Sequence, residues 1–186
     1  MAFSEGGRKV LTIYEDSPIQ KRISSAMQKE WLKLTGEAIT PLNFEDYKND
    51  LNGLSAYLEN TEADTIFMAV SAKTAQNLRP YLGTRLPIYA TSLIHTSHTD
   101  KLRMHDLEDV KFMEMPWVIS HTSSFTMLDG LGKSLQLERF FALGMDSYKI
   151  AKGILNTEIN LPLSLSGVSG DIILNYPFFL RAGSPV

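Results

Sequence analysis

Glu15 and Asp16 are the adjacent residues whose types and position could most readily do chemistry. They follow a short apolar run and precede a helical pattern, so two carboxylates would lie at the carboxyl end of a strand. There they could act as acid and base, or bind a cationic ligand. A simpler interpretation is that acidic residues at a helix N-terminus stabilise the helix dipole by roughly 0.3–1 kcal/mol. We favour this structural role and expect neither residue to be catalytic.

Three other fragments carry catalytic residue types without the required spacing. Residues 132–134 read Gly-Lys-Ser, like the end of a phosphate-binding loop, but the required first glycine falls on Met127. Residues 166–170 place serines beside glycines, yet lack the strand-to-helix elbow of a hydrolase nucleophile. The four histidines have no spacing that makes three ligands converge on a metal: His95, His98, His105 and His121. We therefore predict no enzyme activity, cofactor or metal site.

Composition limits the partners. The chain has 186 residues, 44% of them hydrophobic and 21% charged, which is typical of a globular protein. A formal net charge of -3 argues against nonspecific binding to nucleic acid. With no cysteine, disulfides and thiolate metal sites are impossible, and no apolar run approaches the length of a membrane span. Residues 1–7 lack the features of a signal peptide, and we interpret them as a leader or an expression remnant.

The hydrophobic pattern predicts an α/β fold with a mainly parallel sheet and helices on both faces. Nearly continuous apolar runs suit parallel strands that are covered on both sides. Ser17, followed by proline, caps a first helix that ends at Gly36, with its apolar stripe on Ile19, Ile23, Met27, Trp31 and Leu34. Strands are expected at 8–14, 38–44, 64–70, 87–90 and 110–115, further helices at 47–58, 71–83 and 135–155, and a hairpin at 163–174. Because of Pro41, the strand at 38–44 should lie at an edge.

The search for a binding site follows from this architecture. In open parallel sheets, ligands bind beyond the carboxyl ends of the strands, so the turns after Tyr14, Val70 and Ala90 are the places to examine. The candidate cleft residues in these turns are Glu15, Asp16, Ser17, Ser71, Thr91 and Ser92.

Several fragments in their order along the chain resemble the LppC/LpoA lipoprotein family. They are the strand ending at Tyr14, the helix with Glu30-Trp31 and Gly36, Leu86-Pro-Ile-Tyr-Ala-Thr-Ser92, Met115-Pro-Trp117, Glu138-Arg-Phe-Phe-Ala-Leu-Gly-Met-Asp-Ser-Tyr148 and Leu165-Ser-Gly-Val-Ser-Gly170. The resemblance runs from about Arg8 to Arg181. It implies a type 1 periplasmic binding protein fold in a noncatalytic, outer-membrane lipoprotein of the periplasm, which activates a class A penicillin-binding protein, a peptidoglycan synthase.

The chain departs from the family pattern. The family's lipidated cysteine, its helical N-terminal domain and the opening part of its first lobe have no counterpart in this sequence. We expect residues 8–115 to form the second lobe and residues 116–186 to be the returning segment of the first lobe. Exposed Phe140, Phe141 and Leu143 on helix 135–155, together with Ile150, would then favour a homodimer. A periplasmic solute-binding protein for an amino acid or similar small ligand is the alternative function. A hydrolase that uses Glu15 and Asp16 is a third.

Overall fold

The computed structural model describes residues 1–96, 107–120, 134–156, 163–175 and 178–186. These residues fall into two units, each of which is described by itself. The first unit consists of two stretches of the chain. One is Met1–His95, and the other ends at Phe112. The second begins at Met113 and ends at Val186.

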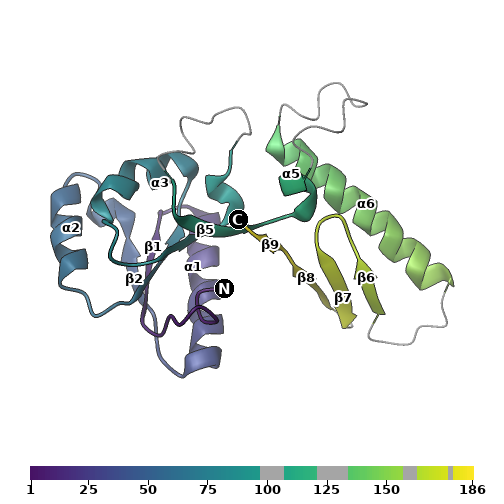
Figure 1. The fold of residues 1–186 in the computed structure, drawn as a ribbon, viewed down its shortest axis with the longest axis horizontal. Helices are drawn as coiled ribbons and strands as arrows, with labels where there is room; N and C mark the ends of the chain where they lie inside the picture. Colours follow the sequence, from purple (N-terminus) through teal and green to yellow (C-terminus); the bar gives the residue numbers. More distant parts are fainter. Residues whose placement is uncertain (97–106, 121–133, 157–162, 176–177) are drawn as a thin grey trace. The chain divides into compact units, whose positions relative to one another are not determined.

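The first unit is built on five strands (Figure 1). They are β1 (Val10–Tyr14), β2 (Thr40–Asn43), β3 (Thr65–Ala69), β4 (Ile88–Ala90) and β5 (Val110–Glu114). The order is β2-β1-β3-β4-β5, and every neighbouring pair is parallel. The predicted parallel pairing of β1 with β3 and of β3 with β4 is confirmed. The strand with Pro41 lies at the edge, as expected, where a missing N–H is tolerated.

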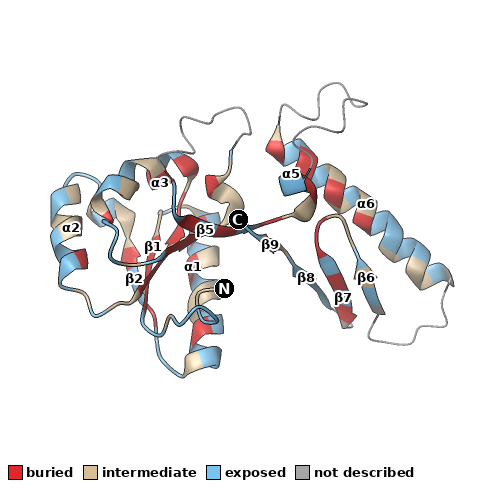
Figure 2. Cartoon of the chain, in the orientation of Figure 1, coloured by how far each residue is buried: buried red, intermediate tan, exposed pale blue. Residues whose placement is uncertain are grey.

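Helices cover both faces of this sheet, which confirms the predicted fold class. They are α1 (Pro18–Thr35), α2 (Leu51–Glu59) and α3 (Ala72–Leu78), with short 3-10 segments η1 (Phe44–Asp46), η2 (Arg79–Tyr81) and η3 (Ser92–Ile94). Strand side chains alternate between the two faces. Leu11 and Ile13 pack in one cluster with Leu54 of α2 and Leu78 of α3. Val10 packs in another with Trp31 of α1. Figure 2 shows the resulting buried strands.

Both predicted ends of α1 are confirmed, but its predicted buried stripe is partly wrong. The Ser17 hydroxyl accepts from the Gln20 N–H at 3.4 Å, and Gly36 takes the left-handed conformation at φ 76°. Ile19 and Leu34 are 54% and 52% exposed, whereas Gln20, Ser24 and Trp31 are buried. The buried face of α1 is therefore rotated relative to the predicted apolar stripe and includes polar side chains. One of them, Gln20, donates a hydrogen bond to Glu15, which follows β1.

Residues 1–7 make specific contacts within the first unit. The Phe3 ring meets the Trp31 ring edge to face, with centroids 6.0 Å apart. The Tyr89 hydroxyl donates to the Glu5 carboxylate at 3.0 Å, and the Lys111 ammonium pairs with the same group. These contacts stabilise the unit whatever the origin of the segment, and the interpretation as a leader or remnant stays a prediction.

The second unit joins two helices to a small antiparallel sheet. Its elements are α5 (Pro116–Ser120), α6 (Leu135–Asn156), β6 (Leu163–Ser166), β7 (Asp171–Asn175) and β8 (Phe178–Ala182). The hairpin of β6 and β7 is confirmed. The third strand, β8, pairs with β7 and was not predicted. A two-residue strand, β9 (Ser184–Pro185), pairs antiparallel with Met113 and Glu114 at the end of β5.

Asp146 of α6 holds the hairpin turn. Its buried carboxylate accepts from the Val168 N–H at 2.9 Å, the Ser169 N–H at 2.8 Å and the Ser169 hydroxyl at 2.5 Å. A Cβ at Gly167 would lie 2.5 Å from an Asp146 oxygen, so only glycine permits this approach. Burial raises the pKa of Asp146, but hydrogen bonds from Ser169 and Val168 outweigh it and leave the pKa below its ordinary value.

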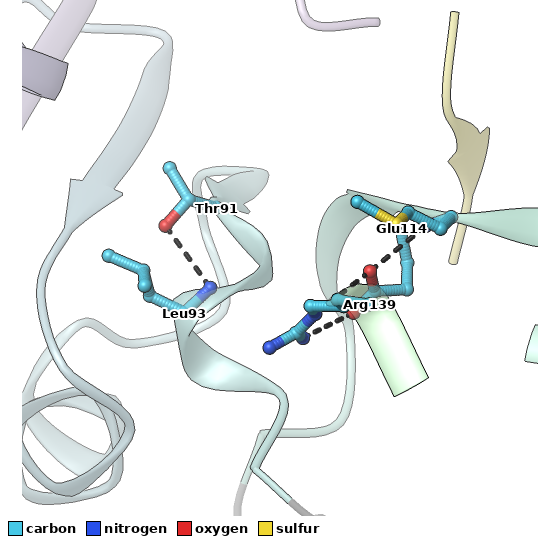
Figure 3. A network of polar contacts seen from close by, with 5 residues as sticks. Thr91, Leu93, Glu114 and Arg139 are labelled. Atoms are coloured by element: carbon cyan, nitrogen blue, oxygen red, sulfur yellow. Dashed lines mark hydrogen bonds and ion pairs between the residues drawn. The ribbon is translucent and has the colours of Figure 1, made fainter. Parts of the chain in front are cut away.

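The later fragments that resemble the family lie together in this unit. The Trp117 N–H donates to the Val168 carbonyl at 2.9 Å, and the Trp117 and Phe141 rings have centroids 5.2 Å apart. Arg139 and Glu114 form a buried ion pair through Nε at 3.3 Å and Nη2 at 2.5 Å (Figure 3). The motifs around Trp117, Asp146 and Gly167 are thus parts of one packing arrangement.

We predict that Asp146→Asn lowers the free energy of unfolding of the second unit by about 1.5–3 kcal/mol, because an amide group would face buried donors. The stabilisation from Asp146 is present above its ordinary pKa of 3.8 and is lost as pH falls through the lower folded-state pKa. Urea unfolding followed by Trp117 fluorescence, in a Trp31→Phe background, measures both effects. Asp171→Asn, at an exposed residue, is the control and should change stability by less than about 0.5 kcal/mol.

A second prediction concerns the N-terminal segment. Phe3→Ala should lower stability by about 1–2 kcal/mol, because it removes the aromatic contact with Trp31 and part of the apolar cover over that ring. Ser4→Ala, at an exposed residue whose hydroxyl donates to the Met1 carbonyl, is a matched substitution in the same segment and should cost less. Equal stability of the two variants in thermal unfolding would mean that residues 1–7 do not stabilise the unit.

Candidate functional site

The candidate cleft residues follow three neighbouring strands. Glu15 and Asp16 follow β1, Ser71 follows β3, and Thr91 follows β4. Because these strands are parallel neighbours, their carboxyl ends lie at one edge of the sheet. The predicted placement of the turns at a common edge is therefore correct, although the side chains make different contacts.

Glu15 is the centre of a hydrogen-bond network at this edge. Its Oε1 accepts from the Ser71 hydroxyl at 2.9 Å and from the Thr74 hydroxyl. Its Oε2 accepts from the Ser71 N–H at 2.9 Å and from the Gln20 amide at 3.1 Å. A carboxylate offers about four lone-pair sites, so these four donors fill them.

The other candidate residues make local contacts. The Asp16 carboxylate pairs with Lys21, and both side chains are about half exposed, at 51% and 52%. Ser17 caps α1. Thr91 caps η3 by accepting from the Leu93 N–H at 3.4 Å (Figure 3). Ser92, half-buried, is the first residue of η3. The structure thus brings Glu15 and Ser71 together, whereas Asp16 contacts Lys21 instead of Glu15.

Sequence reasoning missed Gln20 and Thr74 as members of the network. Gln20 is the third helical residue of the predicted capping box, where its side chain would return to the Ser17 N–H. It donates to Glu15 instead. Thr74 lies three residues after the Ser71 cap, so its hydroxyl is on the same side of the helix start. A helix cap that follows a strand, with a polar residue three positions later, was the available signal.

Two cavities of the first unit lie elsewhere. One, of about 460 Å³, is at the amino ends of β1 and β2, and Lys9, Glu37 and Tyr57 contribute to its wall. The other, of about 270 Å³, is lined by residues that include Leu58 and Arg85. Neither lining contains a candidate cleft residue.

The remaining fragments of interest differ in how far the structure describes them. Of the fragment at 132–134, only Ser134 is described, and three histidines also lie outside the described residues: His98, His105 and His121. The His95 ring lies beside the Phe112 ring at an interplanar angle of 48°, with centroids 5.6 Å apart. Residues 166–170 form the hairpin turn held by Asp146. Within the described ranges, no three His, Asp or Glu side chains are grouped so that they could hold a metal ion.

The architecture places the chain in the class of periplasmic-binding-protein-like α/β folds. Solved structures with this arrangement include one described as a "putative branched-chain amino acid ABC transporter" from Chromobacterium violaceum, with TM-score 0.84 and 23% identity, covering 100% of this chain and 60% of that one. The LpoA C-domain from Haemophilus influenzae, described as a regulator of PBP1A, has TM-score 0.82 and 18% identity over 99% of this chain and 60% of that one. The structure of full-length LpoA from the same organism has TM-score 0.82 and 20% identity, covering 99% of this chain and 35% of that one.

The family follows from the sequence match. Residues 1–177 match the family described as "LppC putative lipoprotein", and the chain belongs to that family. No curated protein matches the chain. The chain spans about 60% of the length of the first two structures above. None of its helices, over the part of the chain that the structure describes, is long and apolar enough to cross a membrane.

We predict that Glu15→Gln lowers the free energy of unfolding by about 1–3 kcal/mol, because an amide NH₂ would face donors that now meet a carboxylate oxygen. Asp16→Asn is the matched control and should cost no more than about 1 kcal/mol, since its ion pair with Lys21 is exposed. Urea unfolding of both variants measures the difference. If the two variants were equally stable, Glu15 would not have the structural role assigned to it.

Proposed function

We propose that this chain is a noncatalytic regulatory domain that activates a class A penicillin-binding protein during peptidoglycan synthesis. The observation that carries the proposal is the match to the LppC family over residues 1–177, together with the fold of the LpoA C-domain, which is described as a regulator of PBP1A. In this proposal the chain acts in the periplasm as part of an outer-membrane lipoprotein. Residues 8–115 form its second lobe and residues 116–186 the returning segment of its first.

The contacts of the two acidic residues support a role without chemistry. A general base must be able to accept a proton from a substrate, and it is best placed within hydrogen-bond distance of that proton. The four acceptor sites of Glu15 are filled from within the fold by donors that include Ser71 and Gln20. Asp16 forms an ion pair with Lys21 and does not share the network of Glu15. Neither carboxylate therefore supports the hydrolase interpretation.

A solute-binding function is the second candidate, favoured by the structural likeness to the protein described as a branched-chain amino acid ABC transporter. Such a protein needs polar groups at the strand ends that converge on a ligand. Here Ser71 donates with both its N–H and its hydroxyl to Glu15. These donors are satisfied by the protein itself, so we expect weak or undetectable binding of free amino acids at this edge.

The test is binding and activation of the synthase. The full chain should bind a detergent-solubilised class A penicillin-binding protein saturably, and it should increase the rate at which that enzyme consumes the lipid-linked peptidoglycan precursor. A class B penicillin-binding protein, which lacks the glycan-polymerising domain, is the specificity control.

Two results would contradict the proposal. One is an unchanged synthase rate with no saturable binding over the micromolar range. The other is a calorimetric titration in which leucine or another branched-chain amino acid binds tightly, which would favour the solute-binding function instead.

A further inference from the structure

The solvent side of helix α1 carries a row of basic residues, which we call the basic stripe. It consists of Arg22, Lys29 and Lys33, all of them exposed. At about 100° per residue, the three positions lie within an arc of about 40°, on the opposite side of the helix from the buried residues Gln20 and Trp31. At a rise of about 1.5 Å per residue, the stripe is about 16 Å long. It therefore points away from the sheet over much of the helix.

The charge of α1 is opposite in sign to that of the chain as a whole. The helix contains four basic residues and one acidic residue, a net charge of +3, whereas the chain has a formal net charge of -3. On the other face of the sheet, residues 44–59 of η1 and α2 contain four acidic residues and one basic residue, a net charge of -3. An anionic surface would thus attract the side of the unit with α1 and repel the side with α2.

The cations of the stripe are free to meet an external anion. Within the described ranges, Arg22 and Lys29 have no ion-pair partner. Lys33 pairs with Glu30 at 3.2 Å, but the two side chains are 72% and 62% exposed, and such a pair contributes little to stability. Binding of an anion along the stripe would therefore break no contact on which the fold depends.

The exposed apolar residues of α6 are a different kind of surface. Of the four residues predicted to be exposed there, only Phe140 is largely so. Phe141 packs against Trp117, whereas Leu143 and Ile150 are half-buried. The homodimer expected through these residues stays a prediction, because α6 lies in the segment proposed to belong to a divided lobe, of which further residues would cover an apolar face. A charged face is stable in water and needs no such cover.

The residue types of the stripe favour a lipid surface over a protein partner. The exposed residues between Arg22 and Lys29 are Ser25 and Ala26, so the stripe lacks the aromatic anchors that dominate protein interfaces. Lysine is also depleted in such interfaces. By contrast, each lysine or arginine beside an anionic membrane strengthens binding roughly fivefold, whatever the detailed shape of the surface. The chain belongs to a family described as lipoproteins, which are attached to a membrane.

We propose that the basic stripe of α1 binds the anionic head groups of a lipid membrane. The contact is electrostatic, because the apolar side of α1 packs on the sheet through Trp31 and cannot enter the lipid. Three cations give a roughly hundredfold preference for anionic over neutral lipid, which orients a protein that a lipid anchor already holds at the membrane. The inference rests on the lipoprotein attachment in the proposed function, and it does not depend on activation of the synthase.

The first experiment is flotation of the full chain with vesicles of equal parts phosphatidylglycerol and phosphatidylcholine. At low ionic strength the chain should bind these vesicles and should not bind vesicles of phosphatidylcholine alone. Binding should fall steeply as the screening length shortens from about 30 Å at 0.01 M salt to about 8 Å at 0.15 M. A triple variant of the stripe, with Arg22→Gln, Lys29→Gln and Lys33→Gln, should bind at least tenfold more weakly.

The control removes the same charge from exposed positions outside α1. It combines Lys48→Gln, Lys73→Gln and Lys152→Gln, and Lys48, like Lys33, is paired with a glutamate three residues before it. This control variant should bind the anionic vesicles as the parent chain does. Thermal unfolding of both triple variants should stay close to that of the parent, because all six side chains are exposed.

Any of three results would overturn the proposal. The first is an equal loss of vesicle binding in the two triple variants, which would mean that net charge alone decides. The second is a stripe variant that binds the vesicles as tightly as the parent. The third is a parent chain that does not bind anionic vesicles, while the stripe variant alone loses binding to the solubilised synthase, which would assign the stripe to a protein partner. In each case the activation of the synthase is measured separately, so its outcome is not confused with this one.

Discussion

The need to satisfy one desolvated carboxylate organises the start of the fold. Glu15 lies where β1 ends, and its two oxygens take donors from α1 and from the residues that begin α3. A half-buried carboxylate that lost such donors would destabilise the fold by about 1–3 kcal/mol, which favours the arrangement in which the three segments meet. The same requirement accounts for the polar residue Gln20 on the buried side of α1, since an apolar residue there would leave Glu15 without its amide donor.

This constraint also has a functional consequence. Parallel sheets of this kind commonly bind ligands at the carboxyl edge because backbone N–H groups and polar side chains are available there. In this chain Glu15 occupies the N–H of Ser71 and two hydroxyl donors at that edge. Asp146 does the same for the turn at Val168 and Ser169 in the second unit. Carboxylates used in this way fix loops, which agrees with the noncatalytic role proposed above.

Much of the fold could be predicted because its signals are local. Ser17-Pro18 and Gly36 define α1, and the alternating run before Pro116 defines β5, from neighbouring residues alone. The buried face of α1 could not be predicted in this way, because it depends on the contact of Gln20 with Glu15 and on the packing of Trp31 against Val10 and Ile39. Strand β8 was missed because Phe178 to Ala182 are all exposed and show no alternation between buried and solvent sides. At the candidate site, the inward direction of Glu15 could not be predicted, because it depends on Ser71 and Thr74, which lie more than 50 residues away.

The two units differ in how completely their apolar side chains are buried. In the first, α1 lies against one face of the sheet and α2 and α3 against the other, so each strand has cover on both sides. In the second, α6 is packed on one face through residues such as Phe141, while Phe140, Tyr148 and Leu155 on its other side are exposed. Leaving several large side chains exposed along one line costs about 1.5–3 kcal/mol for each that a partner could bury.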